Sequence, residues 1–305
     1  MCLRRGLAVV VLTMLGAEAL AQVPVATGRS IAMSNSAWSM FIPDDYKPSG
    51  NKANLVVHFH GDPATFRNNA KYAGVQAVIV TVNYGGLSSA YQTPFAANTS
   101  LFSTIVNEAR AKARAQPDIP DGMAFETLSV TSFSAGYAAI REILKQPANY
   151  SQIDAIGALD SIHAGFVSYP TNKALIASQM ADWRRFASDA AAGRKSFVVS
   201  HSQVDPISYA STTLTANDLL AHIGATATPS SYDGLGTLDM YRTATKGNFR
   251  LYGALGTDGD SHLEHLRYAG EFLKQLPVVS VPETQATLPF FCFGWAVTAG
   301  RKKRK

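Results

Sequence analysis

Cysteine is nearly absent from this sequence: among 305 residues there are two, Cys2 and Cys292, and both lie close to an end. Neither belongs to the part that is expected to fold, because Cys2 lies in a segment predicted to be cleaved and Cys292 lies in a separate tail. A folded body without cysteine excludes an internal disulfide, a thiol nucleophile and a cysteine-ligated metal, whatever the compartment.

Charged residues are also few, at 16% of the chain, and the formal net charge of +5 comes from the two ends. Residues 1–21 hold two basic and one acidic side chain, and residues 301–305 are all basic, which leaves 20 basic and 21 acidic residues between them. The body is therefore close to neutral, and its charge predicts no nucleic-acid partner. With 47% hydrophobic residues, the chain can bury a full core.

The first 21 residues have the pattern of a secretory signal peptide. Arg4 and Arg5 precede an apolar run at residues 7–15, and small residues at 19–21 suit cleavage before Gln22. An uncleaved anchor is the alternative, although the run is short for crossing a bilayer. The sequence thus predicts a bacterial-type signal peptide and an exported protein, located in the periplasm, at the cell surface or outside the cell.

The last residues, 281–305, have a different character. Val281-Pro282-Glu283-Thr284 leads into an apolar run at residues 288–300, and five cations follow. This order resembles the PEP-CTERM sorting signals of some Gram-negative bacteria, although Thr284 stands where the second proline belongs. A disordered or partly buried tail is the alternative. Membrane contact is expected only through this tail, if it is retained.

Between these ends, strand-like and helix-like segments alternate, and residues 22–280 are expected to form one domain. Continuous apolar runs such as Ala77–Val82 suit strands that are covered on both faces. The strand-like runs lie at residues 55–59, 77–82, 128–130, 153–159, 196–200 and 248–253, and the helices at 103–115, 138–144, 174–192, 214–223 and 262–276. An additional antiparallel pair is expected around residues 37–42. The alternation predicts an α/β fold with a mostly parallel sheet and helices on both faces.

The sequence Ser132-Phe133-Ser134-Ala135-Gly136 stands between a short β-prone run and a helix-forming segment. A strand, a small-x-Ser-x-Gly turn and a helix form a nucleophile elbow, which lifts a serine clear of the sheet. Small residues must flank this serine, because larger side chains would collide across the turn. The usual first residue is glycine, so Ser132 is a departure. Taken alone, the pattern fits an ordinary strand-to-helix turn equally well.

Other reactive residues follow the remaining predicted strands. His60-Gly61-Asp62 follows the first core strand, Asp205 follows the fifth, and His262 lies just before the final helix. Open α/β sheets carry their sites at the carboxyl ends of the strands, so these residues are expected near Ser134. The order Ser, Asp, His along the chain resembles the α/β-hydrolase superfamily, in a secreted serine esterase-like branch, over roughly residues 50–276.

The resemblance implies a catalytic domain at residues 22–280 and a role for each residue. Ser134 would attack an acyl carbon, His262 would accept its proton, and Asp205 would orient the imidazole and stabilise its protonated form. No metal and no organic cofactor is needed for this chemistry.

Two of these assignments have alternatives. Asp160 ends the strand before that of Asp205, and some lipase-like branches carry the acid there. For the base, Ser261-x-x-Glu264 predicts a capping box, which puts His262 in the first turn of the last helix. His265 lies one turn further and is more typical of a helix-surface or packing residue.

The oxyanion hole would consist of backbone N–H groups. One belongs to Ala135, directly after the nucleophile, and the other to Asp62 or Gly61 in the turn after the first core strand. Four side chains are expected to line the substrate cleft: His60, Tyr84, Asp160 and His163. A long loop expected at Gly224–Gly247 is a further candidate binding element.

The leading hypothesis is therefore an exported serine hydrolase that cleaves carboxylic esters, either small molecules or polymers, through an acyl-enzyme. The segments between the predicted strands leave no room for a large cap domain. A serine peptidase or amidase on the same fold is the first alternative, because the triad does not separate ester from amide substrates. A non-catalytic surface binding protein is the second.

Overall fold

The computed structural model describes residues 22–117 and 119–279, so the predicted signal peptide (1–21) and the predicted tail (281–305) lie outside the described residues. Its strands, in chain order, are β1 (Gly28–Ala32), β2 (Trp38–Pro43), β3 (Lys52–Phe59), β4 (Val78–Val82), β5 (Ala124–Phe133), β6 (Ala155–Leu159), β7 (Phe166–Ser168), β8 (Asn172–Leu175), β9 (Ser196–His201), β10 (Thr228–Asp233), β11 (Asp239–Lys246) and β12 (Phe249–Ala254).

Ten of these strands form one sheet in the order β1-β2-β4-β3-β5-β6-β9-β12-β11-β10. The six strands from β4 to β12 in this order pair in parallel. At one margin β1 and β2 are antiparallel, and at the other β10 and β11 are antiparallel. The predicted mostly parallel sheet, with an added antiparallel pair near the N-terminus, is confirmed.

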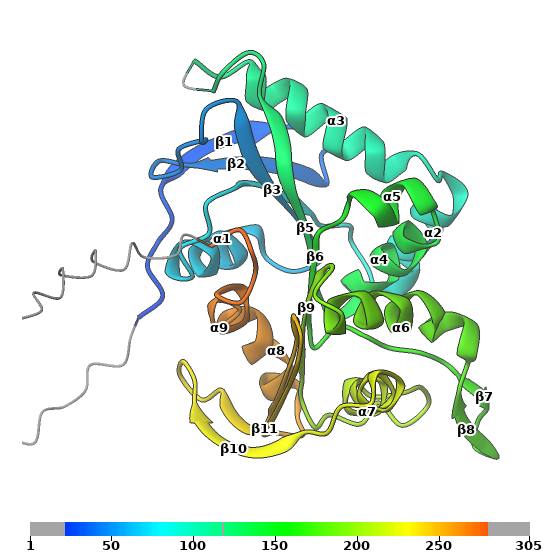
Figure 1. The fold of residues 1–305 in the computed structure, drawn as a ribbon. Coiled ribbons are helices and arrows are strands. Elements are labelled where there is room, and N and C mark those ends of the chain that lie inside the picture. The colour runs from blue at the N-terminus through cyan, green and yellow to red at the C-terminus, as the bar shows by residue number, and fades with distance from the viewer. Residues whose placement is uncertain (1–21, 118, 280–305) are drawn as a thin grey trace, which may run out of the picture.

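Helices cover both faces of this sheet (Figure 1). One face carries α1 (Pro63–Tyr72), α8 (Gly259–Arg267) and α9 (Gly270–Leu273). The other carries α2 (Ser88–Ala97), α3 (Leu101–Arg114), α4 (Tyr137–Leu144), α5 (Pro147–Gln152), α6 (Ala177–Ala191) and α7 (Thr212–Ile223). Among the described residues, no helix has both the length and the apolar character that a bilayer crossing requires.

Two hydrophobic cores, one on each face, result from the alternation of side chains along the strands. In β3, Val56 packs on the side of α1 and α9, whereas Leu55 and Val57 pack on the side of α3 and α4. All three are essentially inaccessible to solvent. Burial on both faces explains why the central strands have continuous apolar sequences.

Two expected segments have a different structure. The expected binding loop at Gly224–Gly247 consists largely of the antiparallel strands β10 and β11, which extend the sheet. The expected helix at residues 262–276 begins earlier and is divided into α8 and α9.

Between β6 and α6 the chain adds only the β7–β8 hairpin, so the described residues contain no domain-sized insertion over the sheet.

Candidate active site

Three neighbouring strands of the parallel sheet are each followed by a residue in the left-handed backbone region. His60 follows β3 with a φ of 72°, Ser134 follows β5 with a φ of 45°, and Asp160 follows β6 with a φ of 43°. Residues with a side chain rarely adopt positive φ, so such turns persist only where the surrounding structure holds them. Because the three strands are adjacent and parallel, the turns lie together at one end of the sheet.

Ser134 lies in the turn that the sequence predicts for a nucleophile elbow. The chain passes from β5 into the single 3₁₀ turn Ser134–Gly136 and then directly into α4. A Cβ atom on Gly136 would lie 2.2 Å from the carbonyl oxygen of Phe59, at the end of β3. Glycine is therefore needed at this position because the turn packs against the backbone of the neighbouring strand.

The close approach of Gly136 to β3 leads to a stability prediction. The Gly136→Ala variant is expected to lose about 3 kcal/mol or more of unfolding free energy, because the obstructing atom belongs to the backbone and cannot rotate away. Urea unfolding followed by circular dichroism measures this loss. Gly85→Ala is the matched control: a Cβ atom added there would have no other atom within 4 Å, so little change is expected. Equal stability of the two variants would contradict the packing explanation.

The hydroxyl of Ser132 takes part in a short series of hydrogen bonds behind Ser134. Ser161 Oγ lies 2.7 Å from Ser132 Oγ and 2.8 Å from the carbonyl oxygen of Ser134. The hydroxyl of Ser161 is the donor in both contacts and is shared between the carbonyl oxygen of Ser134 and Ser132 Oγ, since a carbonyl can only accept. Ser132 thus holds the elbow in position through Ser161, a role that a glycine at the usual first position could not fill.

Asp160 contacts His262. The Asp160 Oδ2 atom lies 2.6 Å from Nδ1 of His262, and the carboxylate is 1% exposed. The same carboxylate accepts hydrogen bonds from the backbone N–H of Ser202 at 2.9 Å, from its hydroxyl at 2.7 Å and from the hydroxyl of Thr212. Four donors therefore satisfy a buried carboxylate, which accepts at about four positions.

These contacts decide the protonation of both partners. Burial by itself raises the pKa of Asp160, but nearby His265, the hydrogen bond from His262 and the hydroxyl of Thr212 outweigh burial and leave that pKa well below its ordinary value. An ionised carboxylate only accepts, so Nδ1 of His262 carries a proton. The Nε2 atom of the neutral ring is then left with a lone pair that can accept a proton.

The expected pairing of Asp205 with His262 is not found, and Asp160, the alternative acid, takes that place. Asp205 is exposed, and its carboxylate accepts a hydrogen bond from the backbone N–H of Ile207 at 2.8 Å, in a local turn. Ser202, directly after β9, donates two hydrogen bonds to Asp160. The physical reason is that β6 lies beside β5 in the sheet, whereas β9, which precedes Asp205, is one strand further away.

His262 lies in the first turn of α8, as the sequence predicts, but the helix has a different cap. Asp258 is the N-cap, and its side chain accepts from the N–H and the hydroxyl of Ser261, so the expected capping box from Ser261 to Glu264 does not form. The ring of His262 stacks on Phe133 with 4.6 Å between ring centroids. Phe133, the residue before Ser134, therefore also positions the imidazole.

His265 is fully buried behind His262. Its Nδ1 atom lies 2.8 Å from Ser200 Oγ, and its ring stacks on Phe272. Burial lowers the pKa of His265 to about 4, so this ring is neutral at pH 7. His265 packs in the core, which agrees with the expectation that it is a packing residue and not the base.

Three backbone N–H groups at the end of the sheet are candidates for an oxyanion hole. Those of Gly61, Asp62 and Ala135 have no hydrogen-bond acceptor within the part of the chain that the structure describes. The side chain of Asp62 caps α1 by accepting from Thr65, which leaves its own N–H available. Gly61 has a φ of 109°, and its turn follows β3, the strand beside β5.

His60 and Tyr84 were both expected to line the cleft. Instead, they belong to a network of hydrogen-bonded aromatic side chains beside it. Nδ1 of His60 lies 2.9 Å from the hydroxyl of Tyr91, which in turn donates to the carbonyl of Tyr84 at 3.1 Å. Tyr84 accepts from the indole N–H of Trp38 at 3.0 Å. Burial, and then the proximity of His262, lower the pKa of His60. Neither side chain lines the two cavities described next.

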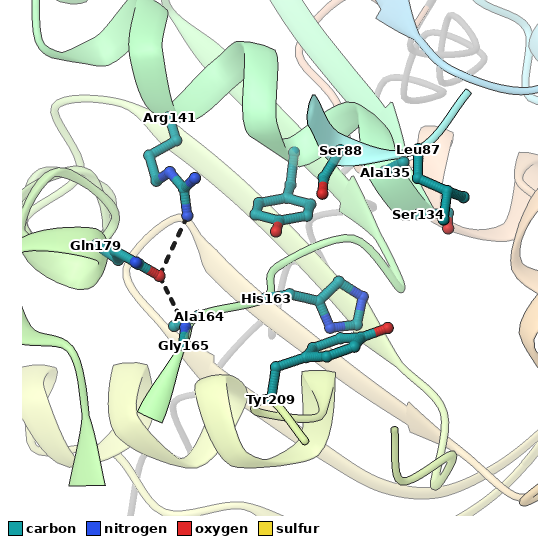
Figure 2. Close-up of a pocket in the computed structure, with 11 residues that line it drawn as sticks. Leu87, Ser88, Ser134, Ala135, Arg141, His163, Ala164, Gly165, Gln179 and Tyr209 are labelled. Atoms are coloured by element: carbon teal, nitrogen blue, oxygen red, sulfur yellow. Dashed lines mark hydrogen bonds between the residues drawn. The ribbon is translucent and has the colours of Figure 1, made fainter. Parts of the chain in front are cut away.

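Two adjoining cavities lie at the end of the sheet and share Ser134, His163 and Tyr209. The small cavity, of about 100 Å³, contains His262 and Asp160. The main cavity, of about 350 Å³, runs from Ser134 along α4 (Figure 2). Its lining residues are Leu87, Ser88, Ser134, Ala135, Tyr137, Arg141, His163, Ala164, Gly165, Gln179 and Tyr209.

His163 is placed where the sequence expected it, in the wall of the cleft. Its ring makes edge contacts with Tyr137 and Tyr209, at centroid distances of 5.4 and 5.3 Å, and its Nδ1–H donates to the carbonyl of Ala210. Burial lowers the pKa of His163. A neutral, fixed ring between two tyrosines forms an aromatic wall for the main cavity.

Sequence reasoning missed most of the residues that line this cavity. Tyr137 and Arg141 lie three and seven residues after Ser134, so they occupy the same face of the helix that the elbow begins, and this spacing was the available signal. Tyr209 and Gln179 come from distant segments and carry no such signal.

Among the described residues, no group of three histidine, cysteine, aspartate or glutamate side chains could hold a metal ion.

The proteins to which this chain is similar are solved structures of low sequence identity. No protein-family model matches the chain, and no curated protein matches it. Among solved structures, an arylesterase is 14% identical with a TM-score of 0.46, covering 84% of this chain and 87% of its own. An ester hydrolase from the metagenome of Lake Arreo is 11% identical with a TM-score of 0.44, covering 84% and 82%. A dienelactone hydrolase-like promiscuous phosphotriesterase from metagenomic libraries is 12% identical with a TM-score of 0.42, covering 83% and 99%.

Proposed function

We propose that this protein is a serine hydrolase that cleaves carboxylic esters, with Ser134 as nucleophile, His262 as general base and Asp160 as the acid that orients it. The observation that carries the proposal is the 2.6 Å contact between His262 and the buried carboxylate of Asp160, beside a serine in a strained elbow. Ser134 and His262 line the same small cavity. Such a constellation is suited to acyl transfer.

The reaction would proceed in two halves. Nε2 of His262 accepts the hydroxyl proton as Ser134 Oγ bonds to the ester carbonyl carbon, and the negative charge develops on the carbonyl oxygen. The tetrahedral intermediate then expels the alcohol, which takes the proton from His262, and an acyl-enzyme remains. Water repeats the sequence, its proton passing to His262 and back to Ser134, and releases the carboxylic acid.

The backbone N–H groups of Ala135 and of Gly61 or Asp62 are suited to bind the developing oxyanion. They have no other acceptor among the described residues, and they come from turns after adjacent strands. Donors already held in place cost no reorganisation during the reaction, and one such donor typically contributes about 10²–10³-fold in kcat. Ser134 Oγ likewise has no hydrogen-bond partner within residues 22–117 and 119–279. Its hydroxyl is therefore not engaged elsewhere.

The proposal also includes export. The first 21 residues have the features of a signal peptide, and the body has no cysteine whose oxidation would matter outside the cytoplasm. An exported esterase would act on esters found in the periplasm or outside the cell.

Covalent labelling tests the proposed nucleophile. A fluorophosphonate probe is expected to modify wild type at Ser134, as identified by mass spectrometry of the labelled peptide, and to leave Ser134→Ala unmodified. Labelling elsewhere, or equal labelling of both proteins, would reject Ser134 as nucleophile. A panel of nitrophenyl esters and matched nitroanilides, assayed with the same samples, separates an esterase from a peptidase or amidase.

A further inference from the structure

The end of the main cavity away from the nucleophile holds a buried cation. Arg141 lines the cavity, and the residue is only 7% exposed. Figure 2 shows its guanidinium at one end of the cavity and Ser134 at the other, with His163 and Tyr209 between them. A buried charge requires compensation, because transfer out of water is costly unless the group is paired.

The guanidinium of Arg141 lies over the Tyr137 ring, 5.3 Å from its centroid, but its polar contacts are long. Nη1 donates to Oε1 of Gln179 over a long 3.4 Å, and the same oxygen accepts the N–H of Gly165 at 2.7 Å. Nε lies 3.8 Å from Glu142, whose carboxylate is bound more closely, at 2.6 Å, by Lys145. Nη2 has no hydrogen-bond acceptor in the described part of the chain.

The one carboxylate within 4 Å of Arg141 in the described part of the chain is shared with a second cation. Glu142 lies 3.8 Å from Nε of Arg141 and 2.6 Å from Nζ of Lys145. Of these two cations, Arg141 is the one that borders the cavity.

The fold places this cation at a definite distance from the nucleophile. Ser134, Tyr137 and Arg141 follow one another at the spacing i, i+3, i+7, which puts them on one face of the elbow and α4. The 3₁₀ turn Ser134–Gly136 and the first turn of α4 separate the two positions by about 10–12 Å along the axis. Figure 2 shows the side chain of Arg141 extending from α4 toward Gln179.

The main cavity lies on the acyl side of the reaction. His262, which returns the proton to the departing alcohol, lies in the small cavity and not in the main one. The alcohol must therefore leave toward the small cavity, and the acyl chain is left to occupy the main cavity beside Tyr137.

We propose that the main cavity binds the acyl part of an ester that carries a second, negatively charged group, a carboxylate, and that Arg141 receives this group. The inference rests on the proposed ester hydrolysis at Ser134 and names its substrate class: monoesters of dicarboxylic acids. Gln179 positions the guanidinium, and the side chains of Tyr137, His163 and Tyr209 enclose the chain between the two ends. A carboxylate at Arg141 would supply the missing acceptor for Nη2 in a charge-assisted hydrogen bond.

Pairs of charged and neutral substrates test the proposed carboxylate subsite without any mutation. The p-nitrophenyl monoesters of succinic, glutaric, adipic and suberic acid are compared with the same compounds whose distal carboxylate is methylated. For at least one chain length, kcat/KM of wild type is expected to be about tenfold or more higher for the charged compound, chiefly through KM, as for a hydrogen bond to a charged group. The preference should shrink in 1 M salt.

Variants at position 141 assign the preference to the guanidinium. Arg141→Gln is expected to reduce the charged-to-neutral ratio at least tenfold, and Arg141→Lys to retain part of it. Arg110→Gln, which removes an equal charge from a half-buried position on α3 that lines neither cavity, is the control for net charge and should keep the wild-type ratio. Hydrolysis of the methylated compound reports whether each variant is folded. If Arg141→Gln fails to fold, the charged-to-neutral ratios of wild type and of Arg141→Lys test the subsite.

The outcomes separate this inference from the function on which it rests. If wild type hydrolyses the methylated esters through Ser134 but prefers no charged member, or if Arg141→Gln keeps the preference, the carboxylate subsite is wrong and the esterase proposal stands. If no ester is hydrolysed, or Ser134→Ala remains active, both fail.

Discussion

Replacing Ser134 by alanine is expected to lower kcat for hydrolysis of p-nitrophenyl butyrate by about 10⁶-fold, which is the loss that removal of the nucleophilic serine causes in a serine protease. The alanine variant keeps the N–H groups of Gly61, Asp62 and Ala135 but has no group that can form an acyl-enzyme. Purified wild type and variant are compared in the same assay, with thermal unfolding as a check that both are folded.

Ser132→Ala is the matched control, because it removes a hydroxyl two residues away in the same turn. Ser132 contacts Ser161 and not the small cavity, so its loss is expected to lower kcat by about tenfold or less. Residual activity of Ser134→Ala within a hundredfold of wild type would contradict the proposed mechanism. So would a Ser132→Ala variant as inactive as Ser134→Ala.

Replacing Asp160 by asparagine is expected to lower kcat by about 10⁴-fold. Oδ1 of residue 160 accepts from the backbone N–H of Ser202, which cannot become an acceptor, so the amide oxygen of asparagine must stay on that side. Its NH₂ group then faces Nδ1 of His262 and favours the tautomer with the proton on Nε2. In that tautomer the ring cannot accept the proton of Ser134.

Asp205→Asn is the control for this substitution, since it makes the same chemical change at the other candidate acid. Asp205 is exposed and hydrogen-bonds only within its own turn, to the N–H of Ile207, which asparagine can also serve. Activity within about twofold of wild type is expected, as for a surface substitution. Loss of activity in Asp205→Asn with retention in Asp160→Asn would reverse the assignment.

The fold could largely be predicted from the sequence because its signals are local. Continuous apolar runs at β4 and β9 indicate strands buried on both faces, and the alternation with helices indicates a parallel sheet. The segment 224–247 was the main exception. Its glycine, serine and threonine residues are typical of a loop, yet β11 pairs with β12, the last of the parallel strands, and becomes ordered through that pairing.

The active-site acid could not be decided from the sequence. Asp160 and Asp205 both follow a strand, and both precede His262 in the chain. What separates them is the position of their strands in the sheet and the donors around each carboxylate: Ser202 and Thr212 surround Asp160, more than 40 residues away along the chain. Residues this far apart are brought together only by the folded sheet.

The sequence by itself determined the class of fold, the elbow at Ser134 and the position of His262 at the start of the last helix, since each depends on neighbouring residues and on the period of the apolar pattern. The tertiary structure alone decided that Asp160 is the partner of His262, that Ser132 supports the elbow through Ser161, and that the main cavity ends at Arg141. These features depend on contacts between separate strands and helices, and a linear pattern does not specify which distant side chains will meet.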